Sequence, residues 1–153
     1  MSTRPMHWLN VMPELYLSSA LDERLGIQIM PNSCAKFFLC REDELRDKEA
    51  FSREIEIGGR NVSCLVYGRG SELRVFLNSC PHTGIRLEWR PDDFLDASGR
   101  YLQCAMHGAL FEPSNGLCVD GPCVDRTLIK IHVEILEGDV LVSGLDELPE
   151  SAR

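Results

Sequence analysis

The sequence predicts an all-β fold, an antiparallel sandwich of short strands. In residues 51–57, Ile55 and Ile57 alternate with Glu54 and Glu56. A Gly-Gly-Arg turn joins this segment to the mostly apolar residues 61–67, a pattern typical of a β-hairpin. Residues 128–136 alternate in the same way, and a Gly-Asp turn leads from them to the apolar residues 140–142. A helical spacing of leucines occurs near the N-terminus only, so helices contribute little to the predicted fold.

Residues 1–32 are predicted to be an N-terminal extension with a short helix. This amphipathic helix would begin near Pro13 and end at Gly26, because Pro suits the first turn of a helix and Gly ends it. Its apolar stripe can pack on the β core of the same chain or against a partner or second subunit, and both possibilities stay open. The stripe consists of Leu17, Leu21 and Leu25.

Residues 33–144 are predicted to form one β domain, followed by a C-terminal tail at residues 145–153. The further elements expected in this domain are a strand at 36–39, a polar turn with one helical turn at 42–45, and a strand at 73–78. That last strand runs directly into a loop that begins near Cys80, where a rigid scaffold can position a functional side chain.

The composition is typical of one ordinary folded domain. The chain has 153 residues, of which 44% are hydrophobic, and this is enough for a single core. Its longest apolar stretches are strand-sized, too short to span a bilayer, and its N-terminus lacks the basic-then-apolar order of a secretion signal. We therefore expect no membrane contact and a cytoplasmic location.

The charge balance excludes one large class of partner. The formal net charge is −8, from 24 acidic and 16 basic residues, and no basic stripe is present, so nucleic-acid binding is not expected. An acidic surface can simply favour solubility, or it can steer the chain towards a basic face on a partner protein. The sequence leaves both roles open.

Two pairs of metal-ligating side chains lie in the middle of the chain. One residue separates Cys80 from His82, two residues separate Cys104 from His107, and a Gly follows closely after each pair. Thiolate sulfur and imidazole nitrogen are ligands for both zinc and iron. Seven Cys in a chain without a secretion signal also indicate metal binding before disulfides.

A Cys-x-His followed further along by a Cys-x-x-His-Gly resembles the ligand pattern of Rieske [2Fe-2S] proteins. The resemblance covers roughly residues 35–143. It implies one [2Fe-2S] cluster, in which Cys80 and Cys104 bind the inner iron. The outer iron would be bound by His82 and His107, near the surface where an electron can leave.

The resemblance also implies an architecture and a covering loop. It implies a Rieske-like antiparallel β-sandwich with an inserted cluster-binding subdomain, here at about residues 79–123. Gly121-Pro122 resembles the proline loop that covers the cluster in this family, so we expect this loop against the inner sulfides. The loop is flanked by Cys118 and Cys123, which can approach each other, and whether they form a disulfide is left open.

Residues 83–103 form a longer segment than the compact Rieske ferredoxins have between their ligand pairs. Residues 87–89 and 94–95 are strand-like, and residues 96–99 have the composition of a turn, so we expect an ordered hairpin here. No function follows from this pattern.

The surroundings of the ligands predict a low reduction potential for this family. High-potential Rieske proteins have a disulfide between the two ligand loops, and the resemblance places Ile85 and Met106 at those positions. A Ser that donates a hydrogen bond to a bridging sulfide in those proteins is Ala109 here. Fewer donors to sulfur stabilise the reduced cluster less, so we expect a potential near about −150 mV.

We therefore expect a one-electron carrier, a Rieske-type ferredoxin that passes electrons from a reductase to an oxygenase or similar terminal enzyme. Its expected partners are redox proteins such as a flavin reductase, an oxygenase or another reductase. We expect no substrate-turnover site, because only His7 and His132 remain beyond the four ligands and a Rieske oxygenase needs a second domain with its own iron site. The oligomeric state is left open.

Two other functions stay open from the sequence alone. A small Rieske subunit of an assimilatory reductase, such as nitrite reductase, resembles this chain, although such subunits often lack some of the ligands that are all present here. A structural zinc module also uses two Cys and two His. Colour separates the zinc module from the others, because zinc is spectroscopically silent and an iron-sulfur cluster is brown to red.

Overall fold

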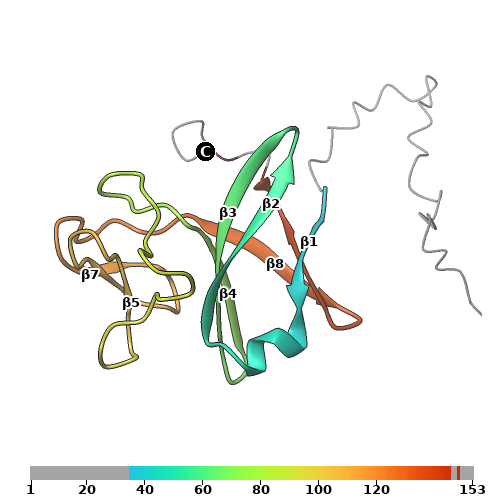
Figure 1. Ribbon diagram of the computed structural model, residues 1–153, viewed down its shortest axis with the longest axis horizontal. Coiled ribbons are helices and arrows are strands. Elements are labelled where there is room, and N and C mark those ends of the chain that lie inside the picture. Colours follow the sequence, from blue (N-terminus) through green and yellow to red (C-terminus); the bar gives the residue numbers. More distant parts are fainter. Residues whose placement is uncertain (1–34, 146–147, 149–153) are drawn as a thin grey trace, which may run out of the picture. The chain divides into compact units, whose positions relative to one another are not determined.

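The regular secondary structure in the described part of the chain is almost entirely antiparallel β-strand. The computed structural model describes residues 35–145 and residue 148, which belong to one compact unit, Ser33–Arg153. The strands of the larger sheet are β1 (Phe37–Arg41), β2 (Ala50–Ile57), β3 (Arg60–Arg69), β4 (Glu72–Leu77), β8 (Lys130–Leu136) and β9 (Asp139–Ser143). They are ordered β1-β9-β8-β4-β3-β2, and the sheet curls so that β1 and β2 contact each other (Figure 1).

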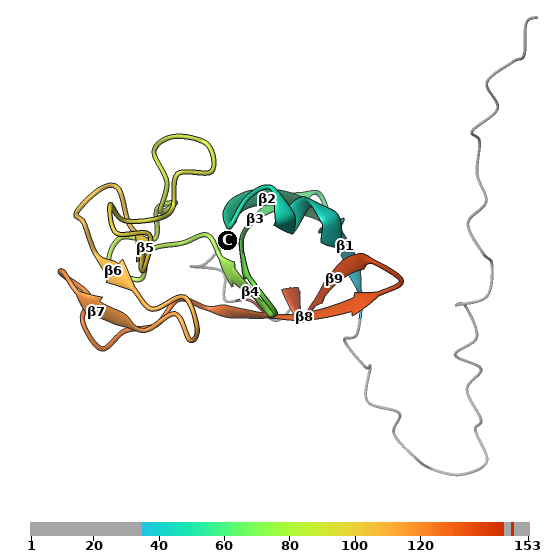
Figure 2. The same ribbon diagram turned by 90° about the horizontal axis from the view of Figure 1, so that it is seen from below.

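A second, smaller sheet is inserted between β4 and β8 in the sequence. Its strands are β5 (Leu102–Gln103), β6 (Leu110–Phe111) and β7 (Cys118–Asp120), which are antiparallel and lie in chain order. Figure 2 shows this insertion to one side of the curled sheet. The predicted all-β antiparallel sandwich with an inserted subdomain is therefore confirmed.

The local elements follow the predicted pattern with two limits. The hairpin of β2 and β3 turns through two glycines and pairs Ile57 with Arg60, and the expected helical turn after β1 is a 3-10 helix, η1 (Glu42–Arg46). The predicted N-terminal helix lies outside the described residues. His132 is exposed. The apolar face of β8 is only partly buried, since Ile135, near the end of the strand, is 46% exposed.

The β3 and β4 strands are buried on both faces, because each face packs against a different hydrophobic core. Cys64 and Val66 of β3 point into a core within the curled sheet. Their neighbours Leu65 and Tyr67, with Phe76 of β4, belong to a second core that includes the inserted subdomain. A strand buried on both faces carries a continuous apolar run, as β3 does.

Two residues of the predicted C-terminal tail contribute to the first core. Leu145 and Leu148 are 2% and 6% exposed and pack with the buried side chains of the curled sheet. The predicted boundaries at residues 32 and 144 remain predictions, but the core extends beyond residue 144.

Asn78 connects the curled sheet to the inserted subdomain. It is 4% exposed, and its side-chain amide donates to Ser63 Oγ (3.1 Å) and Glu88 Oε2 (2.7 Å). Its carbonyl oxygen accepts the backbone N–H of Leu87 at 3.0 Å. Every hydrogen-bonding group of this buried side chain is therefore paired, as burial requires.

We expect Asn78→Ala to lower the free energy of unfolding by about 1–3 kcal/mol, because the Leu87 N–H would lose its partner in a buried place. Urea unfolding of the loaded protein, followed by circular dichroism, measures this loss. Asn61→Ala on the exposed edge of the hairpin is the matched control and should change stability little. Equal stability of both variants would contradict the bridging role of Asn78.

Candidate metal centre

The four predicted ligands lie on two loops with the same hydrogen-bond pattern. In the first loop, which follows β4, the Cys80 N–H donates to the Ile85 carbonyl and the Gly84 N–H donates to the Cys80 carbonyl, both at 2.7 Å. In the second loop, between β5 and β6, the amides of Cys104 and Gly108 make the equivalent bonds at 2.9 and 2.8 Å. The two loops therefore present their ligands in similar ways.

The glycine after each ligand pair is needed for this loop. Gly84 and Gly108 have φ angles of 77° and 72°, in the left-handed region that residues with a Cβ rarely adopt. Each closes its loop through the N–H described above. The two loops are joined directly, because the Ala105 N–H donates to the Leu87 carbonyl at 2.7 Å.

Burial separates the thiols from the imidazoles. Cys80 and Cys104 are 1% and 0% exposed, whereas His82 and His107 are both exposed. The two imidazole rings lie edge to face, with their centroids 4.9 Å apart and an interplanar angle of 74°. The structure therefore brings the four residues together as a buried sulfur pair and an exposed nitrogen pair.

Some groups around Cys104 disfavour its thiolate form, and others favour it. Burial raises the pKa of its thiol, and the neighbouring Cys80 raises it further. The backbone N–H groups of Met106 and His107 hydrogen-bond to it and lower the pKa. Metal coordination deprotonates a thiol outright, and backbone donors of this kind stabilise the charge that results.

This donor set fits a two-iron cluster. Among residues 35–145 and 148, no group of three or more His, Cys, Asp or Glu side chains is placed to hold a single metal ion. The thiol pair is buried and the imidazole pair is exposed, which suits a [2Fe-2S] centre in which each iron has its own pair of ligands. Ligation of a cluster by these four residues stays a prediction that this arrangement supports.

The predicted proline loop packs against the second ligand loop. A Cβ added to Gly121 would lie 2.7 Å from the Ala109 Cα, so only glycine permits this approach. The guanidinium of Arg126 donates to the Pro81 carbonyl at 3.0 Å and thereby attaches the end of the loop to the first ligand loop. Arg126 was not singled out by sequence reasoning, since no motif marks it. The expected place of the loop against the inner sulfides stays a prediction.

The predicted hairpin in residues 83–103 is only partly right. The turn at residues 96–99 is present, and Asp96 accepts hydrogen bonds from the backbone N–H groups of three following residues. Leu95 pairs with Leu102, but residues 87–89 form no strand. Leu87 is completely buried in the second core, so its apolar character comes from packing rather than from strand pairing.

This long segment fastens the subdomain to the curled sheet. Asp92 accepts the backbone N–H of Ser52 at 3.1 Å and pairs with Lys48 at 2.5 Å, and Arg86 pairs with Glu54 of β2. Exposed ion pairs contribute little individually, so the buried Leu87 and its core neighbours supply most of the attachment.

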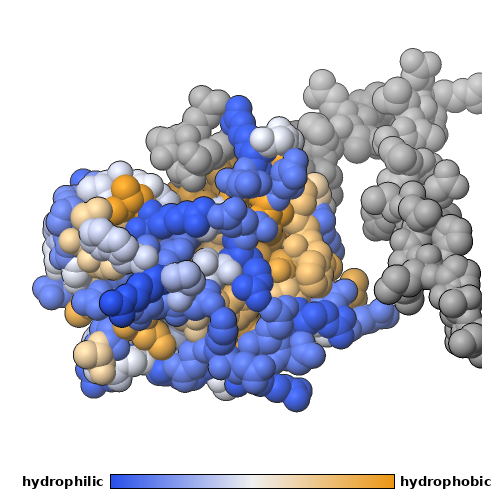
Figure 3. Space-filling model, in the orientation of Figure 1, coloured by the Kyte–Doolittle hydropathy of each residue, from blue (hydrophilic) through white to orange (hydrophobic). Residues whose placement is uncertain are grey.

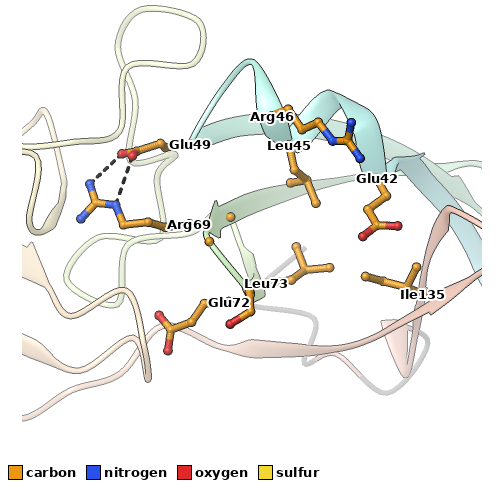
Figure 4. A pocket seen from close by; sticks show the side chains of 11 residues that line it. Glu42, Leu45, Arg46, Glu49, Arg69, Glu72, Leu73 and Ile135 are labelled. Atoms are coloured by element: carbon orange, nitrogen blue, oxygen red, sulfur yellow. Dashed lines mark hydrogen bonds and ion pairs between the residues drawn. The ribbon is translucent and has the colours of Figure 1, made fainter.

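A separate pocket opens in the curled sheet, between η1 and the turn that joins β3 to β4. Figure 4 shows the ion pair of Glu49 and Arg69 at its rim, together with Glu42, Leu45 and Ile135. Its lining mixes acidic, basic and apolar side chains. None of the four predicted ligands lines this pocket, so it is a different surface from the candidate centre.

The family follows from a comparison with known protein families. The model of the Rieske [2Fe-2S] domain matches residues 35–139. This chain belongs to the Rieske [2Fe-2S] domain family. One [2Fe-2S] cluster is accordingly its cofactor. No match was found among curated proteins, and the described residues contain no helix long and apolar enough to cross a membrane.

Solved structures of Rieske ferredoxins share this fold. The complex of reduced oxygenase and oxidized ferredoxin in carbazole 1,9a-dioxygenase contains a chain 24% identical, with a TM-score of 0.55 over 71% of this chain and 93% of that one. The ferredoxin of carbazole 1,9a-dioxygenase from Nocardioides aromaticivorans IC177 is 19% identical, with a TM-score of 0.55 over 71% and 96%. The Sphingomonas yanoikuyae B1 ferredoxin is 23% identical, with a TM-score of 0.54 over 71% and 98%.

We expect Cys80→Ser and Cys104→Ser each to lose the cluster, because a serine oxygen replaces a thiolate ligand of the inner iron. Metal binding is coupled to folding, so the ligand loops should also become less stable. Iron and acid-labile sulfide per chain measure the loss. Cys64→Ala, in the other core, should retain the cluster; a fully coloured, stable Cys80→Ser protein would refute the ligand assignment.

His82→Cys tests the imidazole ligands separately. If the cluster assembles, the added thiolate brings a negative charge to the outer iron, which makes reduction harder, so we expect a lower midpoint potential. A redox titration followed by visible absorbance measures the shift. An unchanged potential would show that His82 does not bind the outer iron.

Proposed function

We propose that this chain is a one-electron carrier, a Rieske-type ferredoxin that accepts an electron from a reductase and delivers it to an oxygenase or similar terminal enzyme. The observation that supports this function is the pair of exposed imidazoles, His82 and His107, above a buried pair of thiols. A metal ligand that is also a surface group shortens the path of an electron to a docked protein. The [2Fe-2S] cluster supplies reversible one-electron chemistry.

The residues around the ligands exclude water from the sulfur side and leave the imidazole side open. Phe111 and Leu102 are completely buried in the core beside Cys80 and Cys104. Apolar surroundings that exclude water lower the dielectric constant around the cluster and thereby influence its reduction potential. Ala109, also fully buried, offers no side-chain donor to sulfur, so the expected low potential remains part of the proposal.

An exposed apolar surface lies on residues of, or close in sequence to, the two ligand loops. Trp89, Met106 and Ile85 are 73%, 44% and 36% exposed, and all three line one shallow pocket next to the ligand loops. On the face shown in Figure 3, small hydrophobic patches lie over the end that carries β5 and β7, and a broader hydrophobic area lies over the curled sheet. Interface cores are enriched in Trp and Met, so this surface suits a transient redox partner.

The relation to solved structures supports the choice of partner class. One of the similar structures is described as a complex of oxygenase and ferredoxin. Electron-transfer contacts are small and short-lived, which agrees with a docking surface of only a few exposed apolar side chains. A cytoplasmic location and a flavin reductase as donor belong to the same proposal.

The first test is EPR of the dithionite-reduced protein, with iron and acid-labile sulfide analysis. We expect two irons and two sulfides per chain and a rhombic signal whose average g lies below that of cysteine-only clusters. This result would establish a His-ligated cluster, as a carrier of this kind needs. A silent protein with one zinc per chain would overturn the proposed function.

Trp89→Ala tests the docking surface. Because the side chain is 73% exposed, its removal should leave stability and midpoint potential unchanged. The loss of an exposed aromatic anchor should weaken partner binding about tenfold, equivalent to about 1.4 kcal/mol. Stopped-flow oxidation of the reduced protein by the oxygenase of carbazole 1,9a-dioxygenase, over a range of oxygenase concentrations, measures this change.

Leu136→Ala is the matched control for the Trp89 variant. Leu136 is 59% exposed at the end of β8, remote in sequence from both ligand loops, and its removal should not affect the reaction with the oxygenase. Equal concentration dependence for the wild type and both variants would place the docking surface elsewhere.

A further inference from the structure

The guanidinium of Arg126 reaches the backbone between the two predicted ligands of the first loop. Its Nη1 donates to the Pro81 carbonyl at 3.0 Å, across 45 residues of sequence. Pro81 stands between Cys80 and His82. A charged donor makes a stronger hydrogen bond than a neutral one, so this contact can hold the backbone of the loop in place.

The Pro81 carbonyl belongs to the same peptide group as the backbone N–H of His82. A peptide group is planar, so a restraint on this carbonyl also restrains the backbone of His82. The ring of Pro81 fixes its φ angle, and the Gly84 N–H holds the preceding carbonyl, that of Cys80, at 2.7 Å. The remaining rotation at Pro81 is about the bond between its Cα and its carbonyl carbon, and the hydrogen bond from Arg126 restrains that rotation.

The two ligand loops are held at equivalent positions in different ways. Ala105, the residue after Cys104, donates its N–H to the Leu87 carbonyl at 2.7 Å. Pro81, the residue after Cys80, has no N–H to donate, so its carbonyl provides the attachment instead. Arg126 therefore supplies to the first ligand loop the support that Leu87 gives to the second.

The main chain of Arg126 is itself fixed. Its N–H donates to the Cys123 carbonyl at 3.0 Å, and its carbonyl accepts the Cys118 N–H at 2.8 Å. The preceding residue, Asp125, has a φ angle of 68° and donates its N–H to the Cys118 carbonyl at 3.1 Å. Because the backbone on both sides is held, only the side chain of Arg126 has to be ordered to make the bond to Pro81.

We propose that Arg126 is a positioning residue for His82, because its guanidinium fixes the peptide group before this ligand and so sets where the imidazole meets the outer iron. This inference rests on the proposed function, since it needs His82 as an iron ligand. His82 is exposed, whereas Cys80 is 1% exposed and enclosed by the core. The place of the imidazole therefore depends on its loop, and hydrogen bonds around a metal site orient the ligands. Arg126 acts through the backbone and does not bind iron.

The test compares the loaded wild-type protein with three loaded variants. Arg126→Met keeps an unbranched side chain and removes every donor, and Arg126→Lys retains a charged donor. Arg74→Met is the matched control, because the Arg74 guanidinium also donates to a loop carbonyl, that of Ser114, at 3.0 Å. Ser114 lies between β6 and β7, outside both ligand loops.

The first readout is the nitrogen hyperfine coupling of the histidine ligands, measured by pulsed EPR on the reduced proteins. The wild type should show two such couplings, one from each imidazole. In Arg126→Met one coupling should change and the other should stay, because the second loop keeps its own attachment through Ala105. Arg126→Lys should restore the wild-type spectrum, and Arg74→Met should not alter it.

The second readout is the rate at which the cluster is lost to an iron chelator, followed by visible absorbance. A hydrogen bond from a charged group corresponds to a change of about tenfold, so Arg126→Met should lose its cluster about tenfold faster than the wild type. Arg126→Lys and Arg74→Met should both lose it at nearly the wild-type rate. Arg126→Gln, whose shorter side chain cannot span the same distance, replaces Arg126→Met if the methionine variant does not load.

Two results would overturn the inference. One is a pair of unchanged nitrogen couplings in the loaded variant that lacks the Arg126 guanidinium. The other is an equal change of both couplings, which would indicate a general loosening of the subdomain rather than a restraint on His82. Both results would leave the cluster content and EPR signal of the wild type intact, so they would not contradict the electron-carrier proposal. A wild-type cluster without histidine nitrogen couplings would contradict that proposal itself.

Discussion

The packing of the inserted subdomain on the outer face of β3 and β4 is the contact on which the candidate centre depends. Leu65 and Phe76 on that face share one core with Cys80 and Cys104. A metal centre needs ligands whose positions are set before the metal binds, and rigid neighbours supply this order. Because the thiols belong to the same core as the supporting strands, the geometry of the sulfur side is tied to the stability of the fold itself.

The same contact divides the centre into two chemical environments. The thiol side is enclosed by the apolar core, whereas His82 and His107 lie outside it at the surface. This asymmetry allows a single site to combine a dry surrounding for sulfur with an accessible edge for electron exchange. The long segment 83–103 contributes to both environments, since Leu87 is buried in the core and Trp89 is exposed in a pocket shared with Met106 of the second ligand loop.

The residues expected to influence the reduction potential of the cluster differ from those of high-potential relatives. The resemblance to high-potential relatives places Ile85 and Met106 at the positions of their bridging disulfide, and Ala109 at the position of their Ser donor. The proline loop instead brings the thiols of Cys118 and Cys123 together, and Arg126 attaches the end of this loop to the first ligand loop. The backbone N–H groups of Met106 and His107 in the second ligand loop donate to the sulfur of Cys104.

The sequence by itself determined the fold class, the family and the positions of the candidate ligands. The alternation of apolar and polar side chains and the glycine turns are local signals, and the Cys and His spacing is a short motif. Both can be recognised without knowing which distant residues are in contact. Tertiary structure decided the rest: the buried role of Leu87, the inclusion of Leu145 and Leu148 in the core, the Asn78 bridge and the 3.3 Å approach of Cys123 to Cys118. These features depend on contacts between residues that are far apart in the sequence. Local spacing and composition do not predict such contacts.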